Sequence, residues 1–147
     1  MCHLPMGMQS GKIRNQQLTA SSSLGKYFGP YLARLHRTSV KGGYRTAWSA
    51  GVSNIYQWIR VDFGKPAKIV RVSTQGRANY DQWMTSFWLS YSLDFLHYVY
   101  YKYQSKIKVS PARKSVSIKL KRMFAKLKIR CDLCLVHTAL QKVQMFS

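Results

Sequence analysis

The sequence predicts an all-β fold, an antiparallel sandwich or barrel, and three observations support this class. Short segments alternate apolar and polar residues, as strands with one buried face do. Turns that contain Gly or Pro separate these segments at short intervals. The 147 residues include 10 Tyr, 6 Phe and 4 Trp, and aromatic side chains favour strands. Since 46% of the residues are apolar, a chain of this length can form one ordinary domain.

The first third of the chain predicts one short strand followed by two long loops. The strand is expected around Gln17–Ala20, directly before the serine run Ser21–Ser23. Glycines interrupt Leu24–Tyr31, and a Gly-Gly pair lies in His36–Arg45, so both segments are predicted to be loops. Both loops are basic and carry aromatic and apolar residues, which is unusual for a connection.

The clearest strands lie in the middle of the chain. Strands are expected on both sides of the turn Gly64–Pro66, and a loop at Ala78–Asp81 separates the second from a third. A fourth, aromatic strand is expected over His97–Tyr103. Period-2 alternation predicts buried positions at Ile59, Val61, Phe63, Val70, Val72, Phe87, Leu89 and Tyr91.

The charge is strongly unbalanced, with 24 basic residues, 4 acidic residues and a formal net charge of +20. Such a chain favours anionic partners: nucleic acid, anionic lipid or sulfated glycan. The sequence contains no apolar run of 18 residues, so no transmembrane helix is predicted. The first residues lack the apolar stretch of a secretory signal. Four scattered histidines and four carboxylates offer no catalytic constellation, so no enzyme is predicted.

The composition changes near residue 105, and the chain divides into 1–104 and a basic tail, 105–147. The tail begins with alternation and then fits helical spacing, so it is expected to be helical or poorly ordered. The spacing is carried by Leu120, Phe124, Leu127, Cys131 and Cys134. A basic amphipathic segment could lie on a membrane or in a partner groove, although a solvated charge run is the preferred interpretation. A lone Cys-x-x-C pair is interpreted as ordinary thiols, because zinc sites usually need a second ligand pair.

Several motifs then occur in an order and spacing that resemble one family. They are "PMGMQSGKIRNQQLTASSS", "GPYLARL", "AWSA", "QWIRVDFGKPAKIVRVSTQGR" and "DQWMTSFWLSYS". Together they resemble the discoidin family, also called the coagulation factor V/VIII type C domain, over roughly residues 2–102. The resemblance implies an antiparallel jelly-roll β-sandwich. It also implies a non-enzymatic, extracellular adhesion or binding module that recognises phospholipid head groups, glycans, collagen or other proteins.

The resemblance further implies that three loops form the ligand surface, at Leu24–Tyr31, His36–Arg45 and Ala78–Asp81. The candidate ligand-binding residues are Leu24, Lys26, Tyr27, Phe28, Val40, Lys41, Arg45, Arg77, Asn79 and Tyr80. Arg77 and Trp83 match positions that the family shares whatever its ligand, so a scaffold role is preferred for both. Trp48 and Trp58 are expected in the core. The resemblance implies no cofactor and leaves a structural calcium ion open.

Three departures from the family pattern qualify these expectations. The turn after "SYS" carries Asp94-Phe95 where the family usually has Asp-Gly, so a distorted or longer turn is expected. The last third does not match the family pattern, so the sandwich is expected to be incomplete at its C-terminal side. Cys2 is expected to lack its usual closing partner.

Two alternatives to a binding module remain. In these alternatives, the chain is either a basic nucleic-acid-binding protein, or a truncated or misspliced product without function.

Overall fold

The computed structural model describes residues 4–37, 46–78, 82–84, 86–104, 106–107, 109–111, 115–124, 126–133 and 140–146. Nearly all regular structure within these ranges is β-strand, which confirms the predicted class. The strands are β1 Leu18–Ala20, β2 Trp48–Ser49, β3 Trp58–Val61, β4 Lys68–Gln75, β5 Ser86–Ser92, β6 Val99–Tyr100, β7 Lys102–Tyr103, β8 Lys106–Ile107, β9 Val109–Pro111, β10 Ser115–Phe124, β11 Lys126–Leu133 and β12 Leu140–Phe146. Two short 3-10 helices, η1 Asn15–Gln17 and η2 Pro30–Leu32, flank the early loops.

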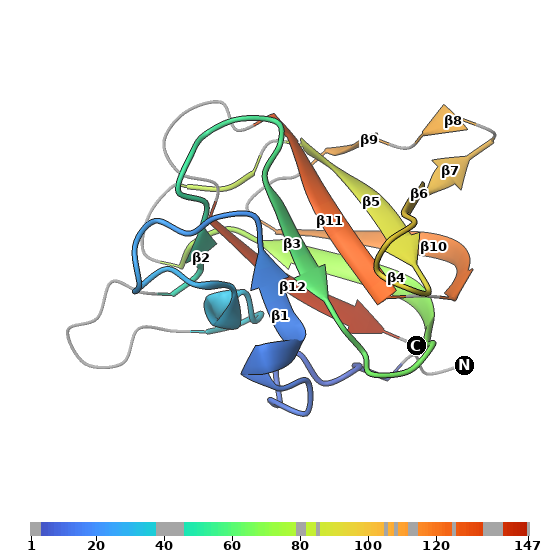
Figure 1. The fold of residues 1–147 in the computed structure, drawn as a ribbon, viewed down its shortest axis with the longest axis horizontal. Helices are drawn as coiled ribbons and strands as arrows, with labels where there is room; N and C mark the ends of the chain where they lie inside the picture. Colours follow the sequence, from blue (N-terminus) through green and yellow to red (C-terminus); the bar gives the residue numbers. More distant parts are fainter. Residues whose placement is uncertain are drawn as a thin grey trace.

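The strands form two antiparallel sheets that face each other as a sandwich (Figure 1). One sheet has the order β1-β3-β11-β5-β6, with β9 also paired to β5. The other has the order β10-β4-β12-β2, and β7 pairs with β8 in a small separate hairpin. The strand expected around Gln17–Ala20 is present as β1, and the strand expected over His97–Tyr103 is broken into β6 and β7.

The last third of the chain supplies strands to both sheets, so the helix expected from Leu120 onward is wrong. β11 lies between β3 and β5, while β10 and β12 lie on either side of β4 (Figure 1, orange and red). Without β11, the facing edges of β3 and β5 would expose unpaired backbone groups, and only a strand can satisfy both. The expected incomplete sandwich is therefore not found, whereas the proposed chain division at residue 104 stays a prediction.

The core lies between the two sheets, and most of the predicted positions are in it. Ile59, Val61, Val72, Phe87 and Leu89 are all at most 1% exposed, which confirms those predictions. Phe63 and Tyr91 are partly buried and pack against this cluster.

Val70 is only half-buried, and its neighbour Ile69 is in the core instead. The register of the ladder between β10 and β4 shifts between Lys119 and Met123, opposite this part of β4, so the pairing is irregular there. Strict alternation does not hold along β4, and Ile69 and Val72 both reach the core.

The tryptophans divide between core and surface. Trp48 is fully buried, as expected, and its indole Nε1 donates a hydrogen bond to the Ser22 carbonyl at 3.0 Å. Trp58 is only half-buried, with the Arg60 guanidinium 5.7 Å from its ring, so its assignment to the core is wrong. The alternation of β3 explains this, because Ile59 and Val61 occupy the inner face and Trp58 the outer one.

The turn between β5 and β6 is long, as expected, and Phe95 adopts φ = 67° in it. A phenylalanine resists this left-handed conformation. Asp94 Oδ1 accepts hydrogen bonds from the backbone N–H groups of Leu96 and His97, at 2.8 and 2.9 Å. The Arg60 guanidinium lies 4.7 Å from the Phe95 ring and adds a cation–π contact. These contacts stabilise the strained residue.

Candidate functional site

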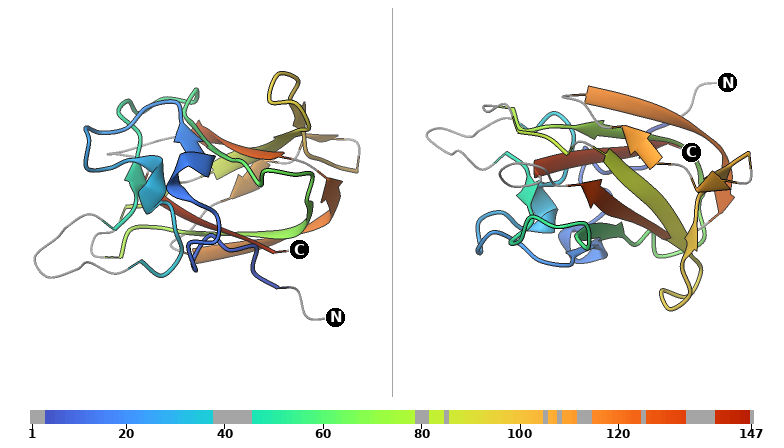
Figure 2. Two further views of the ribbon diagram at one scale, coloured as in Figure 1. Left: turned by 60° about the horizontal axis from the view of Figure 1, so that its bottom comes forward. Right: turned by 90° about the horizontal axis from the view of Figure 1, so that it is seen from above.

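The candidate site lies at one end of the sandwich, where the early loops leave the sheets (Figure 2). We call this region the loop end and define it by residues 22–31, 49–56 and 75–78. The connection after β1, the connection after β2 and the residues that follow β4 all reach this end. The β5–β6 turn, residues 93–98, lies at the opposite end in both views of Figure 2.

Direct contacts hold the bases of the three predicted loops together. The Arg77 guanidinium lies 5.8 Å from the Phe28 ring, which joins the first loop to the third. The backbone N–H of His36 donates to Gln75 Oε1 at 2.9 Å, which joins the base of the second loop to β4. The predicted loops therefore converge at their bases.

The tip of the first loop presents apolar and cationic groups to solvent. Leu24 is 42% exposed and Tyr27 is 43% exposed. The Lys26 ammonium lies 4.9 Å above the Tyr27 ring, a cation–π geometry that keeps a positive charge next to an exposed aromatic face. An anionic surface with an apolar interior matches this combination.

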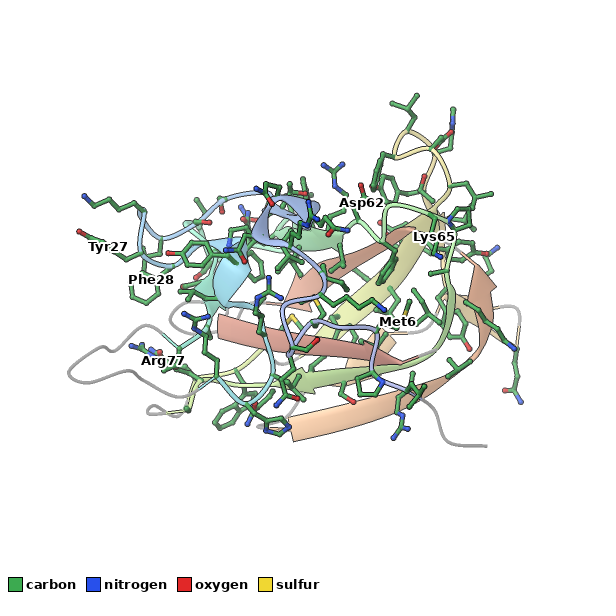
Figure 3. All side chains as sticks on the ribbon, turned by 90° about the horizontal axis from the view of Figure 1, so that it is seen from below. Met6, Tyr27, Phe28, Asp62, Lys65 and Arg77 are labelled. Carbon is green, nitrogen blue, oxygen red and sulfur yellow. The ribbon has the colours of Figure 1, made fainter. Side chains whose placement is uncertain are left out.

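Phe28 and Arg77 belong to the base of the site. Arg77 is only 9% exposed, its backbone N–H donates to the Gln82 carbonyl at 2.9 Å, and its Nη1 donates to Gln82 Oε1 at 3.0 Å. Phe28 is half-buried against that guanidinium. Figure 3 shows both side chains at the loop end, with Tyr27 beyond them. The geometry supports the scaffold interpretation of Arg77, and it adds Phe28 to the scaffold. Trp83 is 37% exposed and so is less buried than a scaffold role predicts.

Gly76 is required for this base because the chain approaches itself closely there. A Cβ atom at Gly76 would lie 2.8 Å from the Gln82 carbonyl oxygen and 2.9 Å from Trp83 Cβ. Ordinary Cβ atoms do not approach other atoms so closely, so a larger residue would push the two sides of the third loop apart.

The serine run fixes the first loop to its neighbour. Gln57 Oε1 accepts hydrogen bonds from the hydroxyls of Ser21 and Ser22, at 2.8 and 2.5 Å. Gln57 Nε2 donates to Asn54 Oδ1 at 2.8 Å, and Ser22 Oγ accepts from the Gly51 N–H at 2.9 Å. This network places the connection between β2 and β3 beside the first loop.

The connection between β2 and β3 contributes exposed apolar residues that sequence reasoning missed. Val52 is 55% exposed, Ile55 is 37% exposed and Tyr56 is 63% exposed. The sequence does carry a signal for these residues. The segment "VSNIY" has no strand pattern, yet it contains three apolar or aromatic residues. We call these residues, together with the exposed Leu24 and Tyr27 of the first loop, the apolar rim of the loop end.

Half of the predicted ligand residues lie outside the part of the chain that the structure describes. Val40, Lys41, Arg45, Asn79 and Tyr80 lie outside the described residues, as do Cys2, Cys134 and His137. In the part of the chain that the structure describes, no group of three His, Cys, Asp or Glu side chains is arranged to hold a metal ion. No helix among the described residues has the length and apolar character needed to cross a membrane.

The carboxylates of Asp62 and Asp94 lie away from the loop end. Figure 3 shows Asp62 on the far side of the sandwich from Tyr27, and Asp94 is part of the β5–β6 turn. The hydrogen bond from the His97 side chain lowers the pKa of Asp94 most, and the N–H groups of His97 and Leu96 and the Ser92 hydroxyl lower it further. Asp94 therefore stays ionised at neutral pH, at the end opposite the positive tip.

Comparisons with known proteins agree with this architecture. A model of the F5/8 type C domain family matches residues 17–132, a range that includes β10 and all of β11 except Leu133. Coagulation factor V from Bos taurus is 44% identical over 79 residues, which cover 51% of this chain and 3% of that protein. Human retinoschisin is 33% identical over 107 residues, which cover 70% of this chain and 47% of that protein.

A solved structure with the same fold is discoidin II of Dictyostelium discoideum. It superposes with a TM-score of 0.82 at 21% identity, covering 99% of this chain and 58% of that one. At this identity the likeness concerns the fold alone. The chain spans less than half the length of either curated relative.

Proposed function

Because this chain belongs to the F5/8 type C domain family, a family of non-catalytic binding modules, we propose that it is an extracellular module that binds anionic phospholipid membranes through its loop end. The first loop makes the primary contact. The exposed side chains of the β2–β3 connection enlarge the contact area. Phe28, Arg77 and Gly76 keep the loop bases in place.

The observation that carries the proposal is the exposed pairing of Lys26 with Tyr27, next to Leu24. Full burial of a side chain of this size in an apolar environment contributes about 1.5–3 kcal/mol. A Lys near an anionic membrane surface contributes about 1 kcal/mol. Insertion of Leu24 and Tyr27 with Lys26 at the head-group level would use both contributions at once.

The net charge of +20 supports an anionic partner but does not distinguish among classes. Exposed apolar side chains favour a membrane over nucleic acid, because a bilayer buries Leu24 and Tyr27 without the cost of unstacking base pairs. A glycan could stack on Tyr27, and collagen or another protein could dock on the rim. These ligands are separate outcomes of the experiment below.

The experiment compares binding to vesicles of phosphatidylserine mixed with phosphatidylcholine by co-sedimentation. We expect the Leu24→Ser/Tyr27→Ser variant to lose at least about tenfold in affinity, because it removes two inserting groups. The matched control is Leu96→Ser/Val99→Ser, which removes two apolar residues at the opposite end that are at least as exposed. The control should bind like the parent.

Equal losses in both variants would contradict the proposal. So would a parent chain that binds heparin, collagen or DNA and ignores the vesicles. Both double variants change exposed residues, so their thermal unfolding should match that of the parent. A match excludes misfolding as the cause of a loss in vesicle binding.

A further inference from the structure

A concave site lies on the side of the sandwich away from the loop end. It has a volume of about 400 Å³ and is bounded by the N-terminal segment and the β3–β4 turn. Figure 3 shows Met6 and Lys65 on the far side of the molecule from Tyr27 and Phe28. We call it the N-terminal cleft. Its size falls in the range of small-molecule sites.

The two walls of the N-terminal cleft are fastened to each other. The Asp62 N–H donates to the Gln17 carbonyl at 2.8 Å, and Gln17 Nε2 donates to the Asp62 carbonyl at 2.6 Å. Because Gln17 lines the cleft and Asp62 precedes the turn that carries Lys65, this pair fixes the separation of the walls. The cleft is thus formed before any ligand arrives.

Gly7 and Lys12 define the shape of the N-terminal wall. A Cβ atom at Gly7 would lie 2.5 Å from Lys12 Cβ and 3.3 Å from Lys12 Cγ, so the lysine stem packs directly over the glycine. Gly7 has φ = 99°, and its carbonyl accepts from the Ile13 N–H at 3.1 Å. The stem of Lys12 is therefore held in place, and the exposed lysine lines the cleft.

The cleft combines an apolar interior with two cations. Ile13 is buried in the core, and Met6 and Phe63 are half-buried against it. Lys12 and Lys65 are exposed and line the same space. Within the described part of the chain, no carboxylate forms a salt bridge with either lysine. The nearby Asp62 accepts a hydrogen bond at Oδ1 from the Gly64 N–H instead, at 2.7 Å.

We propose that the N-terminal cleft binds a small anionic amphiphile, a ring or short chain that carries one carboxylate or sulfonate group. The apolar body lies against Met6, Ile13 and Phe63, and the anionic group meets Lys12 and Lys65 at the rim. The site is separate from the membrane-binding loop end, so neither proposal depends on the other.

The experiment uses two fluorescent probes that differ by one sulfonate group. The first is 8-anilinonaphthalene-1-sulfonate, and the second is its uncharged analogue N-phenyl-1-naphthylamine. We expect the parent chain to bind the sulfonate about tenfold more tightly than the analogue, because two partly exposed charge contacts distinguish them. Lys12→Met/Lys65→Met should bind both probes alike, since methionine keeps the apolar stem that packs on Gly7 and removes the charge.

Two controls separate this site from other apolar surfaces. Lys102→Met removes an exposed lysine outside the cleft and should keep the tenfold preference. Leu24→Ser/Tyr27→Ser, which removes the loop tip, should keep it too. The proposal is overturned if Lys12→Met/Lys65→Met keeps the preference, or if the loop-tip variant loses it.

Discussion

Arg34 is a buried arginine that holds the N-terminal segment to the rest of the fold. It is 8% exposed, and its guanidinium donates to the carbonyls of Met8 and Ile13 and to Asn15 Oδ1, at 2.5, 2.8 and 2.7 Å. Desolvation lowers the pKa of Arg34, and the like charge of Arg37 lowers it further. The group remains charged at neutral pH because the pKa of an arginine starts far above neutral.

Replacement of Arg34 by methionine should destabilise the domain by about 2–4 kcal/mol. The substitution removes three charge-assisted hydrogen bonds and leaves the Met8 and Ile13 carbonyls without their donor. Urea unfolding measures the change. Arg14→Met, at an exposed position in the same segment, should stay within about 0.5 kcal/mol of the parent. If the two variants were equally stable, Arg34 would not anchor the segment.

For single residues, the type of side chain predicts burial less well than its surroundings in the fold do. Arg34 was part of a recognised motif, yet an arginine in a loop-rich segment predicts a surface charge, and its three acceptors are contributed by Met8–Asn15 across the fold. Similarly, Tyr27 and Phe28 are adjacent and chemically alike. Only the contact with Arg77, 49 positions later, turns Phe28 inward while Tyr27 stays exposed.

At the scale of elements, β10 and β11 show how tertiary context overrides a local pattern. The segment from residue 115 to 133 fits a strand as well as a helix, because short apolar windows are ambiguous in periodicity. The unpaired edges of β4, β3 and β5 decide the outcome, and the residues on these edges lie 34 or more positions earlier than their partners in β10 and β11. A pattern read along the chain cannot contain that information.

The loop after β4 depends on close backbone approach, and Gly76→Ala tests it. The added Cβ would meet the Gln82 carbonyl oxygen and Trp83 Cβ at under 3 Å. We expect a loss of about 1–3 kcal/mol in the free energy of unfolding, as for other overpacked sites. Thermal unfolding measures it. Ala78→Ser, which also adds one heavy atom but at an exposed position of the same loop, should be neutral. Two equally stable variants would show that the loop relaxes without cost.

The whole molecule is expected to fold as one unit, because the strands of its last third interleave with those of its first two thirds. β11 has β3 on one side and β5 on the other, and β4 lies between β10 and β12. A chain truncated after Gln104 would leave both sheets with unpaired edges. We expect this truncated chain to lack cooperative thermal unfolding and to aggregate, whereas the full chain unfolds in one transition. A truncated chain with a native near-UV circular dichroism spectrum would instead support a domain that ends at residue 104.

The sandwich class and the strands from residue 58 to 92 were predictable, because alternation and turn residues act locally. The convergence of the loop bases was expected from the family resemblance and not from the pattern itself. The apolar rim of the β2–β3 connection was not predicted, because exposure depends on which residues the Ser21–Ser22–Gln57 network holds against the core.

The central claim is that the loop end inserts into an anionic membrane. The most direct test is amide hydrogen exchange, measured by mass spectrometry, with and without vesicles of phosphatidylserine and phosphatidylcholine. We expect slower exchange at residues 22–28 and 50–56 when vesicles are present, and unchanged exchange at residues 93–98 in the β5–β6 turn. Protection confined to residues 93–98 or 115–133, with none at the loop end, would contradict the claim.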